Sequence, residues 1–373
     1  MDDYQTIAYY ISDYGYGHVT RSLAIIRRLC DHERIQIIIC HAFAFNFINQ
    51  ALSELILAGK VRMRRLENDM GYVLKPHSLQ PDRHQLAIKC TRFIHELPLA
   101  VKREVSFLRN QHVDLVIGDI PPVPFKAARL VSVPSIGLSN FTWFTAYNSL
   151  LPDEVLRPFF DCYKEMDYFF ALAGSKEPQW GREANTNVAF FSRPPQMGIV
   201  HNIRKSVDPK GNQIVVFFGL GMRINAGNLN AYKLWHSRNC VFLVSENLDI
   251  EGETIYKIPG DEAESQNYLA ASDLVISKPG WSTVAEAVNA HKPLILVKRN
   301  NMPEDEHTIG YLQKHGGCEL IRWEQMNKFT ITDDLLHQLD KQKNRSMMNS
   351  ENVLNDLADE IQTILYHKQD GYS

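Results

Sequence analysis

The N-terminal segment contains one strand–turn–helix–strand unit, and this unit constrains the fold more than any other feature of the sequence. Residues 6–12 predict a strand, Gly15 and Gly17 a tight turn, residues 20–30 a helix, and residues 35–40 a second strand. Two strands that are joined through a helix run parallel in the same sheet. The unit therefore predicts an α/β fold with a parallel sheet.

The same alternation of strands and helices continues along the chain, whose 373 residues are enough for two hydrophobic cores. Further strands are predicted at 114–117, 135–138, 214–221, 240–246, 254–259, 273–280, 292–299 and 318–323, and a helix at 127–130. Residues 192–213 contain three prolines and two glycines, a composition typical of an interdomain linker. We therefore predict two doubly wound domains, residues 1–205 and 206–373, with the last helix packing back on the first domain.

Charge and cysteine content exclude several classes of protein. The net charge is −3 and no dense basic stripe is present, so nucleic-acid binding is not expected. The short run Arg62, Arg64 and Arg65 fits a solvated face, with weak peripheral contact to an anionic membrane as the alternative. The six cysteines form no CxxC pair and no zinc-type spacing. The N-terminus does not resemble a leader, and no apolar run has the length of a membrane span, so we expect a cytoplasmic location.

His18 follows the paired glycines of the first turn. A dinucleotide fingerprint requires a third glycine, where Thr20 stands, and an acidic residue after the second strand, which ends in Cys40 and His41, so NAD binding is disfavoured. The positive end of a helix disfavours imidazolium and keeps the neutral ring available as a base. The alternative is a histidine that only packs or caps the helix.

Asp119 ends the apolar strand DLVIGD, at the edge where open α/β sheets place their ligand-contacting groups. A carboxylate at this position can orient His18. Because Ile-Pro-Pro follows, an ordinary turn residue is an equal alternative.

The segment SKPGWSTVAEAVNAHKPLILVKR reads as a glycine turn, a helix starting near Ser282, and a strand. The N–H groups of the helix start and the hydroxyls of Ser282 and Thr283 form a phosphate cradle. Glu286 lies about one turn further, where its carboxylate can accept hydrogen bonds from two ribose hydroxyls. A capping box between Thr283 and Glu286, in which the carboxylate only serves its own helix, is an equal alternative.

These motifs together resemble the GT-B glycosyltransferases: the Gly-x-Gly-His-x-x-Arg turn, GDIPPVPFKAARLVSVPSIGLSNFTW, and the segment just described. The similarity is to the peptidoglycan N-acetylglucosaminyltransferase type, and more closely to the glycosyltransferase-like domain of plant L-arabinokinase. The resemblance spans most of the chain. It implies two Rossmann-like domains facing a central cleft, with an acceptor-binding first domain and a second domain that binds a nucleotide sugar, usually UDP-linked. It also implies inversion at the anomeric carbon, with no catalytic metal and no cofactor.

The resemblance also implies roles for individual residues. His18 matches the catalytic histidine and Asp119 an acidic partner seen in some members. Ligand-binding positions are matched by Gly15 and Gly17 in the first turn, Gly219 and Gly221 in the first donor-domain loop, Ile258 beside the base, Gly280, Ser282 and Thr283 at the diphosphate, Glu286 at the ribose, and Glu306 and His307 at the sugar. An amide-rich pattern is usual at the sugar, and Glu-Asp-Glu-His replaces it here, so the sugar stays unidentified.

Several aromatic residues follow strand or turn positions near these motifs. Phe141, Trp143 and Phe144 form either core, which we favour, or a platform for the acceptor. Trp281 is equally open to both interpretations.

The sequence thus predicts an inverting, metal-independent hexosyl- or N-acetylhexosaminyl-transferase that moves a sugar from a nucleotide donor to an acceptor hydroxyl. Because one fold supports several chemistries, the alternatives are a nucleotide-sugar hydrolase or 2-epimerase. A regulatory protein that binds a nucleotide sugar without turnover is a third possibility.

Overall fold

The computed structural model describes residues 4–75, 80–221, 229–299, 302–340 and 350–367. The chain divides into two compact units. Unit 1 comprises Met1–Leu74, Pro81–Ala189 and Glu351–Ser373, and unit 2 comprises Lys75–Gln80 and Phe190–Ser350. The division after Ala189 falls before residue 205, where the linker composition placed it.

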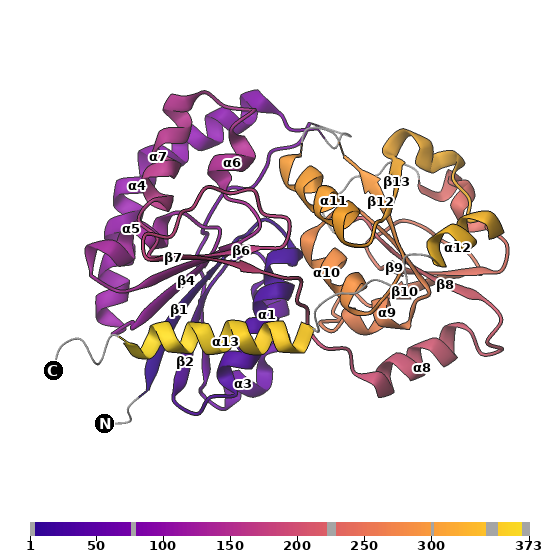
Figure 1. The fold of residues 1–373 in the computed structure, drawn as a ribbon, viewed down its shortest axis with the longest axis horizontal. Helices are drawn as coiled ribbons and strands as arrows, with labels where there is room; N and C mark the ends of the chain where they lie inside the picture. Colours follow the sequence, from indigo (N-terminus) through magenta and orange to yellow (C-terminus); the bar gives the residue numbers. More distant parts are fainter. Residues whose placement is uncertain (1–3, 76–79, 222–228, 300–301, 341–349, 368–373) are drawn as a thin grey trace. The chain divides into compact units, whose positions relative to one another are not determined.

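Unit 1 is a seven-stranded parallel sheet with helices on both faces (Figure 1). Its elements are β1 (Gln5–Ile11), α1 (Tyr16–Cys30), β2 (Ile35–Cys40), α2 (Phe45–Ala51), α3 (Ser53–Leu57), β3 (Val61–Arg64), α4 (Arg83–Asn110), β4 (Leu115–Asp119), α5 (Val123–Leu130), β5 (Ser135–Ser139), α6 (Trp143–Tyr147), α7 (Asp153–Tyr163), β6 (Tyr168–Leu172), β7 (Ala184–Val188) and α13 (Ser350–His367). The strand order is β3-β2-β1-β4-β5-β6-β7. The sequence order of the strands therefore reverses between β1 and β4.

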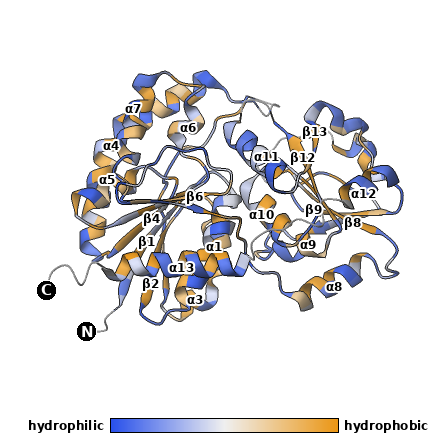
Figure 2. Cartoon of the chain, viewed as in Figure 1, coloured by the Kyte–Doolittle hydropathy of each residue, from blue (hydrophilic) through white to orange (hydrophobic). Residues whose placement is uncertain are grey.

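The central strands of unit 1 are buried along their whole length. All seven residues of β1 and all five of β4 are buried. Helices α4, α5 and α7 pack together on one face, and α1 and α13 lie on the other (Figure 1). Strands covered on both faces are expected to be continuously apolar, and Figure 2 shows them mostly orange, whereas the helices carry both kinds of residue.

Helix α13 comes from the end of the chain and belongs to unit 1. Thr186 in β7 donates a hydrogen bond to Glu360 at 2.9 Å, and the ring of Tyr366 lies 5.8 Å from that of His32. The helix therefore completes the layer that α1 begins.

Unit 2 repeats the plan with six parallel strands in the order β10-β9-β8-β11-β12-β13. Its elements are α8 (Met197–Val207), β8 (Ile214–Gly219), η1 (Leu229–Ala231), η2 (Lys233–His236), β9 (Cys240–Ser245), β10 (Ile255–Ile258), α9 (Gln266–Ala271), β11 (Leu274–Ser277), α10 (Trp281–Asn289), β12 (Leu294–Lys298), α11 (Pro303–His315), β13 (Glu319–Arg322), η3 (Trp323–Lys328) and α12 (Asp333–Asp340). Here the order reverses between β8 and β11.

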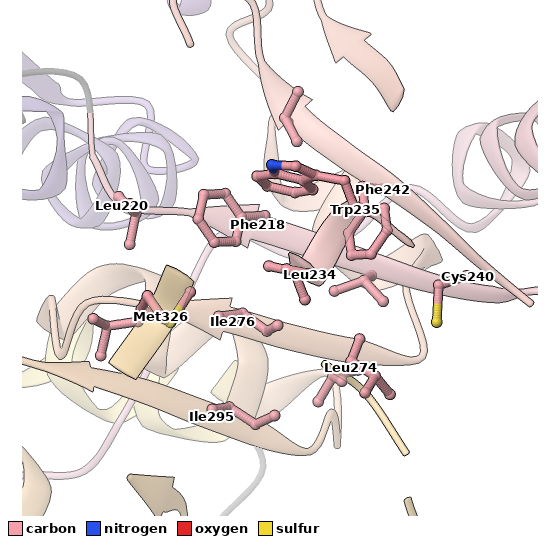
Figure 3. Close-up of a cluster of buried hydrophobic side chains, with 14 of the residues drawn as sticks. Phe218, Leu220, Leu234, Trp235, Cys240, Phe242, Leu274, Ile276, Ile295 and Met326 are labelled. Atoms are coloured by element: carbon pink, nitrogen blue, oxygen red, sulfur yellow. The ribbon is translucent and has the colours of Figure 1, made fainter. Parts of the chain in front are cut away.

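One side of the unit 2 sheet is filled by aromatic and aliphatic side chains (Figure 3). The Trp235 ring stands edge-on to Phe218 and Phe242, at centroid distances of 5.0 and 5.1 Å. Ile276 and Ile295 from the neighbouring strands continue this layer. Side chains of β8 and β11, which pair as neighbouring strands, belong to this core. The carboxyl ends of these two strands carry the candidate ligand-binding residues of unit 2.

The segment 192–213 is not an irregular linker. It contains α8, which packs against α9, and Arg204 of α8 bonds to Asp273 and Asp208 at 2.5 and 3.2 Å. The prolines flank the helix rather than interrupt it, which is why composition alone was misleading. No helix in the described ranges is long and apolar enough to cross a membrane.

Candidate active site

The carboxyl ends of β1 and β4 lie side by side in unit 1. Ile11 pairs with Asp119 in the parallel register, and Ser12 N donates to the Asp119 carbonyl at 3.2 Å. This is the place where the strand order reverses, and in open α/β sheets a crevice for ligands forms there. The fold alone therefore points to the loops after β1 and β4.

A glycine turn leads from β1 into α1. Gly15 is the N-cap of the helix and has φ of +94°, a backbone conformation that residues with a Cβ rarely adopt. The helix begins at Tyr16, whereas the sequence placed its start at residue 20. His18 therefore lies inside the first turn, and Arg21 follows three residues later on the same face.

His18, Arg21 and Asp119 form a buried cluster. His18 Nδ1 lies 2.9 Å from Asp119 Oδ1. Arg21 donates two hydrogen bonds to the same carboxylate, from Nε to Oδ2 at 2.7 Å and from Nη2 to Oδ1 at 2.5 Å. Arg21 Nη2 is also 2.9 Å from His18 Nδ1. The structure thus brings together the two predicted residues, His18 and Asp119, and adds a cation that the prediction missed.

The end of β5 holds the other side of Arg21. Arg21 Nη1 donates to Asn140 Oδ1 at 2.8 Å, and Nη2 donates to Ser139 Oγ at 3.2 Å. Ser22 of α1 adds a longer bond of 3.4 Å to Asp119 Oδ2. The ends of two strands, β4 and β5, together with helix α1 therefore fix the geometry of the cluster.

Asp119 is ionised in this setting. Its complete burial would raise the pKa, but the charge of Arg21, followed by that of His18 and the hydrogen bonds from both, lowers it to about 2. A bidentate guanidinium is the partner that best compensates a carboxylate removed from water. The carboxylate is therefore a permanent hydrogen-bond acceptor for its neighbours.

Backbone strain follows Asp119 directly. Ile120 has φ of +67°, which is a genuine outlier for a β-branched residue. Its carbonyl accepts a 2.6 Å bond from the buried Tyr163 hydroxyl, which in turn accepts from Trp143 N at 3.2 Å. Such strain persists only where the surroundings impose it, and it is concentrated at functional sites. Asp119 is therefore the buried last residue of β4, held by Arg21 and His18, and does not have the environment of an ordinary turn residue.

The predicted aromatic residues mostly fill core. Trp143 is fully buried and Phe141 nearly so, while Phe144 packs against Phe160 and Trp180. The rings of Phe141 and His18 meet edge to face, with their centroids 5.8 Å apart. In unit 2, Trp281 is also core, since it packs against Phe190 and Phe191.

A different group of aromatic side chains lines an open hollow of about 200 Å³ beside the first turn of α1. Tyr16 contacts Phe43 and Phe47 edge-on at 5.2 and 5.0 Å, and Arg65 lies over Phe45 at 4.3 Å. The arginines of the basic run do not share one solvated face. Arg65 lies at the hollow, whereas Arg64 forms an ion pair with the buried Glu104 at 2.5 Å.

In unit 2 the matching strand ends belong to β8 and β11, where Gly219 pairs with Ser277. Gly221 has φ of +91°, and a Cβ there would lie 3.0 Å from Lys278 Cε. Lys278 therefore fills the space between the loop after β8 and the turn before α10. No hydrogen bond or ion pair from another described residue holds its ammonium group.

Lys278 is poorly solvated as well as unpaired. Burial lowers its pKa to about 8, with the charge of Arg299 acting in the same direction and the charges of Asp305 and Glu304 opposing it. Desolvation of an ammonium group is costly unless an anion compensates it. The position therefore favours an anionic ligand.

Helix α10 begins at Trp281 with Gly280 as its N-cap, so Ser282 and Thr283 lie in the first turn. The capping box is wrong, because Thr283 lies inside the helix and Glu286 binds elsewhere. Glu286 Oε1 lies 3.1 Å from Nη2 of Arg193, a cation whose side chain is completely buried. Burial raises the pKa of Glu286, and Arg193 opposes that shift.

The remaining predicted positions are spread over unit 2. Ile258 ends β10 and its carbonyl accepts from Glu246 N at 3.1 Å. Glu306 is exposed in the first turn of α11 and pairs with Lys298 at 3.0 Å, and the half-buried His307 follows it. The buried residues of this turn are Glu304 and Asp305, and Asp305 accepts two hydrogen bonds from Arg299, at 2.6 and 2.5 Å.

Comparisons with known proteins relate the chain to glycosyltransferases. Residues 256–364 match the glycosyltransferase family 28 C-terminal domain. The chain is 24% identical over 331 residues to L-arabinokinase of Arabidopsis thaliana, which covers 84% of this chain and 30% of that protein. It is 26% identical over 335 residues to the UDP-N-acetylglucosamine--N-acetylmuramyl-(pentapeptide) pyrophosphoryl-undecaprenol N-acetylglucosamine transferase of Flavobacterium psychrophilum, which covers 81% of this chain and 86% of that enzyme.

Solved structures match the fold over nearly the whole length of the chain. The calicheamicin glycosyltransferase CalG4 matches with a TM-score of 0.59 and 15% identity, over 97% of this chain and 98% of that one. A Listeria monocytogenes protein described as a UDP-N-acetylglucosamine 2-epimerase matches with a TM-score of 0.60 and 12% identity, over 98% of this chain and 97% of that one. The chain has the GT-B fold of glycosyltransferases.

Within that fold class, the family 28 domain together with the two parallel sheets supports a nucleotide-sugar glycosyltransferase. The matched domain starts in β10 and runs into α13, so it includes the helix that packs on unit 1.

Three functional candidates escaped the sequence analysis: Arg21, Lys278 and Arg193. Arg21 had a signal, because its spacing of three from His18 places both on one helical face. Lys278 lies directly before Pro279 and Gly280 in the quoted motif, but a lysine at a turn is usually solvated. Arg193 had no local signal, since its partner is 93 residues away.

Proposed function

We propose that the chain is an inverting glycosyltransferase that uses His18 as the general base towards an acceptor hydroxyl, with a UDP-sugar as donor. The contact of 2.9 Å between His18 Nδ1 and Asp119 Oδ1 is the observation that carries this proposal. A carboxylate on Nδ1 orients the ring and leaves Nε2 to accept the proton. The hydroxyl then attacks the anomeric carbon while the bond to the nucleotide diphosphate breaks.

Unit 2 supplies the groups for the donor. The first turn of α10 and the Lys278 ammonium group face a departing diphosphate with positive charge, which stabilises the charge that develops on it. Glu286 is held by Arg193 through one carboxylate oxygen, and the other is assigned to the ribose hydroxyls. Glu306 and His307 are assigned to the sugar.

The donor assignment is tested by calorimetry with UDP and a panel of UDP-sugars. Glu306→Gln is the informative control beside Glu286→Gln, because both remove one carboxylate charge from unit 2. We expect Glu286→Gln to weaken both ligands and Glu306→Gln to weaken only a UDP-sugar. Equal affinities for UDP in Glu286→Gln and the unaltered chain would leave Glu286 as a partner of Arg193 alone.

The reaction itself is tested by mass spectrometry of donor and acceptor mixtures. A glycosylated acceptor whose anomeric configuration is opposite to that of the donor supports the proposal, and retention contradicts inversion. We also assign the chain to the cytoplasm, where nucleotide sugars would reach it, and a cell-fractionation experiment tests this.

The fold match to a UDP-N-acetylglucosamine 2-epimerase favours a second candidate function. An epimerase needs no acceptor and changes the configuration of the sugar itself. Incubation with UDP-sugars alone separates the two candidates: an isomerised nucleotide sugar indicates epimerisation, free sugar indicates hydrolysis, and an unchanged donor leaves transfer.

A further inference from the structure

We infer that Arg21 is a positioning residue for His18: its guanidinium fixes Asp119 so that His18 carries its proton on Nδ1, and its charge offsets the pull of Asp119 on a second proton. The inference concerns the proton on His18 and rests on the proposed function only for its use in catalysis. It adds a third member to the histidine–carboxylate pair.

Hydrogen-bond geometry sets the tautomer. Asp119 Oδ1 is approached by His18 Nδ1 at 2.9 Å and by Arg21 Nη2 at 2.5 Å. A bare Nδ1 could accept a hydrogen bond from Arg21 Nη2 at 2.9 Å, but it would then face Asp119 Oδ1, which as an ionised carboxylate oxygen only accepts, at the same distance. With the proton on Nδ1, both nitrogens donate to the same oxygen. The second hydrogen of Arg21 Nη2 then points to Ser139 Oγ, at 3.2 Å.

Rigid placement of the carboxylate requires the fork of an arginine. Arg21 binds both oxygens of Asp119 and is itself held by Asn140 and Ser139. A lysine is a point charge that cannot hold two oxygens in one plane. Arg21 thus fixes which oxygen faces His18.

The charge of Arg21 acts against protonation of His18. Arg21 Nη2 is 2.9 Å from His18 Nδ1, so an imidazolium would meet a guanidinium as well as the carboxylate. Tyr9 of β1 also lies beside this cluster, and because burial raises its pKa it stays neutral. Arg21 and Asp119 are therefore the opposing charges, and each unbalanced charge at such distances moves a titration midpoint by about one to three pH units.

The experiment is nitrogen-15 NMR of the histidines in the full chain, with His18 assigned from the signal lost in His18→Gln. The unaltered chain should show the Nδ1–H tautomer. Arg21→Gln should raise the His18 titration midpoint by about one pH unit or more, whereas Arg21→Lys, which keeps the charge, should leave it nearly unchanged. Arg28→Gln, which removes an exposed guanidinium from the same helix, is the matched control and should have no effect.

Several results would overturn the inference. An Nε2–H tautomer in the unaltered chain contradicts it without any variant. Equal midpoints in Arg21→Gln and the unaltered chain, or equal shifts in Arg21→Gln and Arg21→Lys, would reduce Arg21 to a structural residue. If Arg21→Gln does not fold, Asp119→Asn tests the same charge in reverse: the midpoint must fall, because His18 then faces Arg21 alone.

No substrate is needed for these measurements, so the two proposals fail separately. A chain that transfers no sugar but shows the predicted midpoints loses the proposed function and keeps the role of Arg21. A chain with transfer activity and an unaffected His18 loses the role of Arg21 only.

Discussion

In both units the strand order reverses in the middle of the sheet, between β1 and β4 in unit 1 and between β8 and β11 in unit 2. The side chains at the carboxyl ends of these strands differ between the two units. In unit 1 this region holds His18, Arg21 and Asp119, joined by hydrogen bonds of 2.5 to 2.9 Å. In unit 2 this region holds glycines, a helix start and Lys278. Among the described side chains, none forms a hydrogen bond or ion pair with the Lys278 ammonium group.

The difference teaches how one architecture can separate two tasks. A saturated network of charges fixes one ring in one orientation, as a catalytic base requires. A buried ammonium group beside glycines, with no direct partner among the described side chains, leaves room and charge for an anionic ligand. We therefore assign proton transfer to unit 1 and donor binding to unit 2, and the following predictions test that division.

The largest effect should come from His18→Ala. Loss of the base should lower turnover by at least about 10²-fold, and a steady-state assay with the true acceptor measures it. Asp119→Asn should lower turnover less, because the base survives without its fixed partner. The exposed His84→Ala serves as control, and near-normal turnover in His18→Ala would remove this residue from the mechanism.

The next effect is on stability in acid. The pKa of Asp119 is about 2 in the folded chain, below its ordinary value of 3.8, so its ionised form adds stability above pH 4. That contribution, about 2 kcal/mol, is lost as the pH falls from 4 to 2. Urea unfolding should show the difference between the unaltered chain and Asp119→Asn shrinking over this range. The exposed Asp31→Asn should show no such change, and a constant difference for Asp119→Asn would contradict the assignment.

Much of the architecture can be predicted from the sequence, because buried parallel strands leave continuous apolar runs. β2 has the predicted bounds, and the predicted strands of unit 2 contain β8 to β13. The long helix α4 was missed, since it contains Pro98, which sequence rules take as a helix end. Helix α8 was also missed, because the prolines on either side of it suggested a linker.

The site was only partly predictable. His18, Asp119 and Glu286 stand in local motifs, so their sequence context identifies them. Arg21 shares a motif with His18, but its partner Asp119, like Glu286 for Arg193, lies far along the chain. The same holds for Ile120, whose carbonyl accepts from Tyr163. Such tertiary contacts leave no periodic pattern in the sequence.

A smaller effect should appear in the pH dependence of donor binding. The pKa of Lys278 is about 8, so its ammonium form is present below pH 8 and is lost above it. If it binds the diphosphate, the affinity for UDP should fall by roughly tenfold between pH 7 and pH 9.5, the size of one charge-assisted hydrogen bond. Lys278→Met should bind UDP weakly at both pH values. A parallel decline in Lys278→Met would assign the pH dependence to another group.

The smallest effect is expected from metal removal. The sequence has no Asp-x-Asp pair to hold a divalent ion against the diphosphate, and Lys278 and the start of α10 are assigned that task. Turnover should stay unchanged in EDTA. Loss of activity in EDTA and its recovery with Mg²⁺ or Mn²⁺ would contradict this assignment.

The central claim is that donor binding belongs to unit 2 and proton transfer to unit 1. Its most direct test is a calorimetric titration of UDP into the unaltered chain, His18→Ala and Glu286→Gln. We predict an unchanged Kd for His18→Ala and a Kd about tenfold higher for Glu286→Gln, because an amide keeps the bond to Arg193 but accepts less strongly from ribose. Equal loss of affinity in both variants, or loss in His18→Ala alone, would contradict the division between the units.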